Sequence, residues 1–203
     1  LKLQHFDAMA RELEILQRAI GVQGEMIAKA EQTRETGSSL FHGGVVYQQD
    51  GGLPPAKYHD GLVLRAREAG VSIFPDTAVV SLEKKGSDYK LHTARGDIVA
   101  SQIAVCTNGY TDSLWPGLAG SVVSLTSVQV ASEPLPVDVR DSILPGGHTF
   151  SDTRRTILYG RREPDGRMVL GSIGQGDAGA APDFRRLRRE AIRIFPQLAR
   201  ATW

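Results

Sequence analysis

The stretch that decides the fold is residues 77–107, TAVVSLEKKGSDYKLHTARGDIVASQIAVCT. Apolar and polar residues alternate with a period of two along 80–83 and again along 89–93, with turn residues at 86–88. Alternation interrupted by turn residues predicts a β-meander. The final segment, 102–107, has a continuous apolar middle, which is typical of a strand covered on both faces. We expect this last strand to lie at the centre of an α/β sheet.

Two amphipathic helices are predicted on the amino-terminal side of this stretch. The first has an apolar stripe at spacings of three and four residues, formed by Phe6, Met9, Leu13, Leu16 and Ile20. The second has a similar stripe, formed by Tyr58, Leu62, Ala66 and Ala69. A glycine follows each stripe, at positions 21 and 70, and is expected to end the helix. Short strands are predicted at 43–47 and 71–74.

On the carboxy-terminal side, β-forming residues dominate. A β-prone run occupies 122–130, and two further segments, 156–162 and 167–173, flank the sequence EPDG at 163–166. Pro, Asp and Gly each favour a tight turn for a different backbone reason, so the two segments predict a β-hairpin.

A last helix is predicted from about Pro182, with an inward face formed by Phe184, Leu187, Ala191, Ile194 and Phe195. The predicted fold class is therefore α/β plus α+β. Its second half is an antiparallel sheet with helices packed on it.

Composition and charge exclude several classes of protein. The chain has 203 residues and carries 24 Lys and Arg against 23 Asp and Glu, a net charge of +1. This balance lacks the positive field of a nucleic-acid-binding protein, and no apolar run is long enough to span a membrane.

The single cysteine, Cys106, excludes an intramolecular disulfide and is expected to be buried and inert. It fits a reducing compartment, so we expect a cytoplasmic protein. The five histidines show no ligand spacing, so no metal site is expected.

One motif suggests a dinucleotide site. Residues 174–179, GQGDAG, match G-x-G-x-x-G between a predicted strand and a predicted helix. In a true fingerprint the helix begins inside the motif, and an acidic residue about 20 positions later binds the ribose. Here Ala180-Ala181-Pro182 intervenes, and no acidic residue follows Glu190. A glycine-rich connector is therefore the favoured interpretation of Gly174–Gly179, and an NAD(P) site is the alternative.

Tyr159 and Arg161 form a candidate binding pair. They are two residues apart on a predicted strand, so their side chains share one face, whereas Arg162 points the other way. A guanidinium binds a carboxylate through two parallel hydrogen bonds, and a phenol adds another donor. The spacing therefore fits a carboxylate clamp, and it equally fits two surface residues of an edge strand.

An ordered series of segments resembles one family. The segments are PAKY at 55–58, AGVSI at 69–73, TAV at 77–79, VCTNGYT at 105–111, SEPL at 132–135, DGR at 165–167 and FPQL at 195–198. Together they resemble the FAD-dependent amine and D-amino-acid oxidase family, which includes glycine oxidase and sarcosine oxidase. The pattern is most similar to that of the gamma-glutamylputrescine oxidoreductase branch.

The resemblance implies an FAD-dependent enzyme that oxidises the C–N bond of a small amine or amino acid to an imine, with oxygen as the electron acceptor. It also implies that Val79 contacts the cofactor, and that Thr107, Asn108 and Gly109 form a turn close to it. Tyr159 and Arg161 would lie on the substrate-domain sheet. The family pattern assigns no catalytic residue here.

The resemblance also implies a domain organisation. Residues 1–52 would be a helix and a linker to a substrate-domain strand, 53–110 part of the FAD-binding domain, and 111–203 the substrate-binding domain. We expect the chain to be a piece of a longer protein, because the family's amino-terminal glycine-rich loop and carboxy-terminal flavin segment have no counterpart. The chain alone would then be inactive. A non-catalytic β-rich association module is the alternative from another class.

Overall fold

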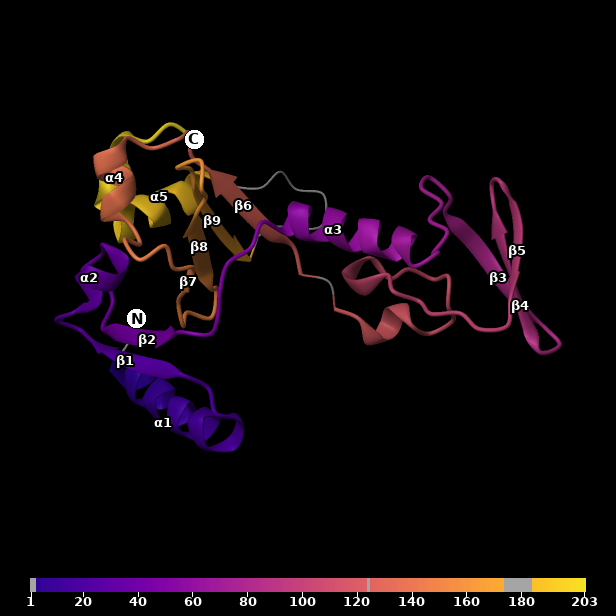
Figure 1. Cartoon of the computed structure of the whole chain (residues 1–203), viewed down its shortest axis with the longest axis horizontal. Coiled ribbons are helices and arrows are strands. Elements are labelled where there is room, and N and C mark those ends of the chain that lie inside the picture. The colour runs from indigo at the N-terminus through magenta and orange to yellow at the C-terminus, as the bar shows by residue number, and fades with distance from the viewer. Residues whose placement is uncertain (1–2, 124, 174–183) are drawn as a thin grey trace. The chain divides into compact units, whose positions relative to one another are not determined.

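The computed structural model describes residues 3–123, 125–173 and 184–203 (Figure 1). Its helices are α1 (Leu3–Ile20), α2 (Gln32–Thr36), α3 (Pro55–Glu68), α4 (Val137–Ser142) and α5 (Phe184–Ile194). Its strands are β1 (Gly24–Ala28), β2 (Gly43–Tyr47), β3 (Val79–Lys85), β4 (Asp88–Thr93), β5 (Gly96–Ala100), β6 (Ser127–Ala131), β7 (Phe150–Ser151), β8 (Leu158–Arg162) and β9 (Met168–Ile173). The chain divides into unit 1, residues 1–53 and 126–203, and unit 2, residues 54–125.

The larger sheet of unit 1 is built on the predicted hairpin. Its strand order is β6-β9-β8-β7, and every neighbouring pair is antiparallel (Figure 1). The turn between β8 and β9 is closed by backbone hydrogen bonds from Glu163 to Arg167 and from Gly166 to Glu163, at 2.8 and 3.0 Å. Gly166 has a φ of +89°, a conformation that glycine adopts without strain. The hairpin prediction is confirmed. In the run at 122–130, the part in β6 pairs with β9, and the other described residues of the run do not pair.

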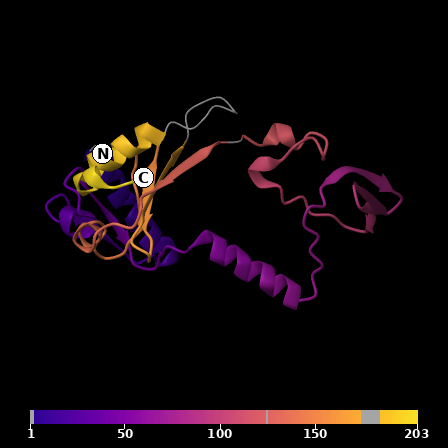
Figure 2. The same cartoon turned by 90° about the horizontal axis from the view of Figure 1, so that it is seen from above.

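The two faces of this sheet have different roles. Leu158 of β8 and Leu170 of β9 face the core, where they lie with Ile194 and Phe195, each at most 2% exposed. Helix α5 contacts β6 and β9 and covers this face (Figure 2). The inward stripe of α5 is confirmed except for Phe184, which is 46% exposed. Residues at the alternate positions, including Tyr159 and Arg161, point to the other face, as the period of a strand requires.

The amino-terminal part of unit 1 pairs a helix with a two-stranded sheet. Strands β1 and β2 are antiparallel, and α1 contacts both. Leu13 in the middle of the predicted stripe is 4% exposed, whereas Ile20 at its end is 71% exposed. The helix ends at Ile20 as predicted, because Gly21 adopts a φ of +71° and its N–H donates to the carbonyl of Gln17.

Unit 2 contains helix α3 and the predicted meander. Strands β3, β4 and β5 pair in sequence order, with a register shift between Val79 and Ser81. The imidazole of His92 in β4 links the three strands by hydrogen bonds. Its Nε2 lies 2.8 Å from Glu83 Oε1 of β3, and its Nδ1 lies 2.7 Å from Asp97 Oδ1 of β5. The meander prediction is confirmed.

Three expectations for unit 2 are wrong in this structure. The segments 71–74 and 102–107 are not strands, because no described segment pairs with them and a strand requires such a partner for its backbone groups. Cys106 is exposed instead of buried. The apolar stripe of α3 is likewise open, with Tyr58 at 58% and Leu62 at 52% exposure, because no described residue of unit 2 covers it. In the described parts of the chain, no helix has both the length and the apolarity of a membrane span.

Candidate functional site

A cavity of about 670 Å³ lies within unit 1. Its wall includes β2, residues of α1, and the strands β7 and β8, so segments distant in the sequence meet there. Apolar residues at its wall include Phe6, Met9 and Phe41. Tyr159 and Arg161 both line it, so the predicted pair shares one face and one hollow. A volume of this size suits a small-molecule ligand.

The phenol of Tyr159 is held by β6. Its oxygen lies 2.6 Å from Ser127 Oγ, and Gln129 Nε2 donates to it at 3.4 Å. The ring crosses β9, the strand that separates β8 from β6 in the sheet. The position of the Tyr159 hydroxyl is therefore fixed by two polar side chains from an earlier part of the sequence.

The guanidinium of Arg161 is already paired. Its Nε and Nη2 lie 2.7 and 2.6 Å from the same oxygen of Glu163, Oε1. The two side chains are 26% and 20% exposed, so the pair is only partly screened by water. Arg162 points to the other side of the strand, as predicted, and its Nη1 donates to the carbonyl of Arg140 at 2.8 Å. A ligand carboxylate would thus either share the guanidinium of Arg161 with Glu163 or displace Glu163 from it.

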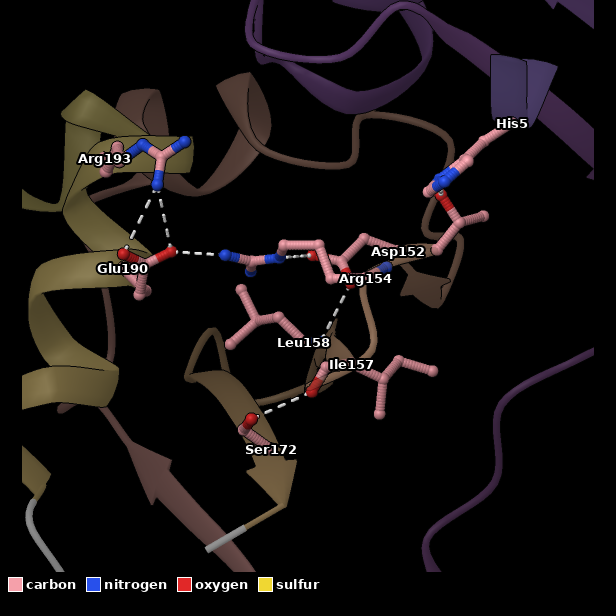
Figure 3. Close-up of polar contacts among 9 residues, drawn as sticks. His5, Asp152, Arg154, Ile157, Leu158, Ser172, Glu190 and Arg193 are labelled. Carbon is pink, nitrogen blue, oxygen red and sulfur yellow. Dashed lines mark hydrogen bonds and ion pairs between the residues drawn. The ribbon is translucent and has the colours of Figure 1, made fainter. Parts of the chain in front are cut away.

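The loop between β7 and β8 is fixed by a buried carboxylate (Figure 3). Asp152, whose side chain is fully buried, accepts hydrogen bonds from the backbone N–H groups of Arg154 and Leu158 and from Arg154 Nε. Arg154 also bonds Glu190 of α5, which Arg193 approaches at 3.4 Å. Burial alone would raise the pKa of Glu190, but the hydrogen bond and charge of Arg154 outweigh it and hold this pKa below its ordinary value. This network fastens one wall of the cavity to α5.

The same loop is linked to α1. His5 Nδ1 lies 2.7 Å from Thr153 Oγ1, and His42 and His148 also line the cavity. No group of three or more His, Cys, Asp or Glu residues among those described could hold a metal ion. His5, His42 and His148 thus belong to the wall of the cavity.

The predicted cofactor residues lie in unit 2. Val79 begins β3, and Thr107 precedes a short 3₁₀ turn, Asn108–Tyr110. Asn108 and Gly109 are exposed, Asn108 has a φ of +49°, and a Cβ at Gly109 would meet no atom within 4 Å. The missing side chain of Gly109 therefore leaves free space on that side of the turn. The alternative motif Gly174–Gly179 lies outside the described residues.

Several residues of the site are absent from the sequence-based set. Ser127, Gln129, Glu163 and Asp152 all touch the predicted pair or hold the loop beside it. Glu163 could have been found from its opposite charge two positions after Arg161, where the strand passes into the turn. The contacts of Ser127 and Gln129 depend on strand pairing across 30 or more residues and leave no local signal.

Comparisons with known proteins agree with this architecture. The crystal structure of glycine oxidase from Geobacillus kaustophilus matches with a TM-score of 0.74 at 19% identity, over 100% of this chain and 54% of that chain, and shows a shared fold. Probable oxidoreductase OrdL from Rhizobium meliloti (strain 1021) is 31% identical over 172 residues, 84% of this chain and 40% of the relative. Gamma-glutamylputrescine oxidoreductase from Escherichia coli (strain K12) is 25% identical over 81% of this chain and 39% of that protein.

The chain thus spans about two fifths of the length of the curated relatives that it matches. The sequence model of one family, DAO (FAD dependent oxidoreductase), matches residues 1–203. The chain belongs to the DAO family of FAD-dependent oxidoreductases.

Proposed function

We propose that the protein containing this chain oxidises the C–N bond of a small amine or amino acid to an imine, which water then hydrolyses. The observation that carries the proposal is the sheet face on which Tyr159 and Arg161 both line a cavity of about 670 Å³. Family membership supports the reaction type, and the cavity supports a small-molecule substrate.

In this proposal, residues of unit 1 bind and orient the substrate. Arg161 attracts a substrate carboxylate, and the hydroxyl group of Tyr159 donates a second hydrogen bond to it. The apolar wall formed by Phe6, Met9 and Phe41 limits water around the carbon that is oxidised. Such positioning raises the rate by holding the reacting carbon in one orientation.

We further propose that Val79, Thr107, Asn108 and Gly109 contribute to holding FAD. When bound, FAD supplies the acceptor for the hydride that leaves the carbon beside the nitrogen. At Gly109 no side chain obstructs the approach of the cofactor, because even an added Cβ there would meet no atom within 4 Å. Residues 53–110 would then belong to the FAD-binding part and 111–203 to the substrate-binding part.

Two finer points complete the proposal. Oxygen is the proposed final electron acceptor, which yields hydrogen peroxide. A cytoplasmic location is proposed because the one cysteine, Cys106, is an exposed free thiol, which suits a reducing compartment.

The test uses the purified full-length protein that contains this chain. We expect it to carry flavin, and we expect anaerobic addition of a panel of α-amino acids and diamines to bleach the visible absorbance of the oxidised flavin with at least one member. Readmitted oxygen should restore the absorbance and produce hydrogen peroxide. A protein that purifies without flavin would contradict the proposal, and so would flavin that dithionite reduces but that no amine reduces.

A further inference from the structure

The position of Tyr159 depends on the residue that its ring crosses. In the registers of the larger sheet, Gln129 of β6, Gly171 of β9 and Tyr159 of β8 form one row across three strands. The phenol oxygen reaches Ser127 and Gln129 on the far strand. To do so, the ring must lie flat over the residue between them, which is Gly171.

The space above Gly171 is filled by that ring. A Cβ added to Gly171 would lie 2.3 Å from Tyr159 Cζ and 2.5 Å from its hydroxyl oxygen, distances that real Cβ contacts do not show. Gly171 is buried, although Val169, which lies on the same face of β9, is only half-buried. A glycine within a strand often marks such a close approach.

Gly160, the other glycine of this hairpin, has a different role. A Cβ there would lie 2.7 Å from the carbonyl oxygen of Val169 and 2.9 Å from the ring of Phe150. These atoms belong to the backbone and the core, so they cannot move without disturbing the fold. The obstacle at Gly171 is instead the far end of one side chain, which can rotate away.

We propose that Gly171 is a positioning residue for substrate binding, because its missing Cβ lets the Tyr159 ring cross β9 and present its hydroxyl, paired with Ser127, to an acceptor on the substrate. This inference rests on the proposed function. Only one hydroxyl hydrogen can lie between the oxygens of Tyr159 and Ser127, which are 2.6 Å apart. Among the described residues neither hydroxyl donates to a third group, so the second hydrogen is available to a carboxylate oxygen of the substrate.

A double-mutant cycle tests this role in the full-length flavoprotein. Gly171→Ala should raise KM for the best amino-acid substrate about tenfold with little change in kcat, the effect of losing one hydrogen bond to a charged group. In a Tyr159→Phe background the same substitution should change KM less than about twofold, because the hydroxyl that it displaces is already gone. Equal effects in both backgrounds would overturn the proposal.

A spectroscopic measurement tests the geometry independently of activity. In protein labelled with 3-fluorotyrosine, the ¹⁹F resonance that is missing from Tyr159→Phe belongs to Tyr159. Gly171→Ala should shift this resonance, and Gly61→Ala, at a helix position with no atom within 4 Å of the added Cβ, should leave it in place. An unchanged Tyr159 resonance in Gly171→Ala would refute the positioning role.

The two readouts separate the possible failures. If no amine reduces the flavin of the wild-type protein but the Tyr159 resonance still shifts, the proposed reaction fails and the positioning by Gly171 stands. Gly160→Ala serves as the structural comparison: it should lower the melting temperature more than Gly171→Ala does. If Gly171→Ala lowers it equally, Gly171 is a packing residue and the proposal fails.

Discussion

Removing the carboxylate of Asp152 should loosen the loop that forms one wall of the cavity. This side chain is fully buried and accepts hydrogen bonds from Leu158 N at 3.1 Å, from Arg154 N at 3.2 Å and from Arg154 Nε at 2.5 Å. In Asp152→Ala, the amide of Leu158, a residue only 2% exposed, loses its acceptor at a cost of about 1–3 kcal/mol. Loss of the pair with Arg154 brings the expected destabilisation to about 3–5 kcal/mol.

The matched variant Asp152→Asn separates the two contributions. Its side-chain oxygen can still accept from the two backbone amides, but the ion pair with Arg154 is gone, so we expect a loss of about 1.5–3 kcal/mol. Urea denaturation of the full-length protein measures the free energy of unfolding. Hydrogen exchange at the Leu158 amide reports the loop directly and should accelerate far more in Asp152→Ala than in Asp152→Asn. Equal losses in the two variants, or a loss below about 1 kcal/mol in Asp152→Ala, would refute the reasoning.

Two further predictions concern charged groups. Glu163→Gln should release the guanidinium of Arg161 and lower KM for carboxylate-bearing substrates roughly fivefold, the equivalent of about 1 kcal/mol for a partly exposed ion pair; steady-state kinetics that show no change, or a higher KM, would count against a role for Arg161 in binding. In the meander, the hydrogen bonds of His92 to Glu83 and Asp97 raise its pKa above the ordinary 6.5. A raised pKa contributes stability below about pH 6.5 that is lost as the pH rises through the folded-state value. Asp97 remains ionised at mildly acidic pH because the hydrogen bonds from Lys90 and His92 lower its pKa. The difference in melting temperature between wild type and His92→Gln should therefore be larger at pH 5.5 than at pH 8.5, and a difference that grows with pH would contradict this assignment.

The elements that could be predicted from the sequence are those that local chemistry determines. The β8–β9 hairpin follows from the turn residues Pro164, Asp165 and Gly166, and the end of α1 follows from Gly21. The meander follows from the alternation of apolar and polar residues and from the turn residues between the strands. In each case the deciding interactions join residues close in the sequence.

The elements that could not be predicted depend on partners distant in the sequence. The apolar segments 71–74 and 102–107 have strand-like compositions, but no described segment pairs with them. A continuous apolar run favours burial between two layers only where those layers exist. The same reason explains the exposure of Cys106 and of the apolar side of α3.

The candidate site shows the same division. Strand periodicity correctly placed Tyr159 and Arg161 on one face and Arg162 on the other. It could not show that Gly171 lies beneath the Tyr159 ring, because that contact depends on the pairing of β8 with β9. The assignments of Val79, Thr107, Asn108 and Gly109 to the cofactor remain predictions.

The most direct test of the central claim compares two arginines on one strand. Stopped-flow reduction of the flavin by a carboxylate-bearing amine should show, for Arg161→Met, an apparent Kd raised about tenfold or more with a limiting rate near that of the wild type. Arg162→Met, whose side chain points away from the cavity toward Arg140, should leave this Kd unchanged. If Arg161→Met binds the substrate as tightly as the wild type, or if both variants lose affinity equally, the sheet face that carries Tyr159 and Arg161 is not the substrate site.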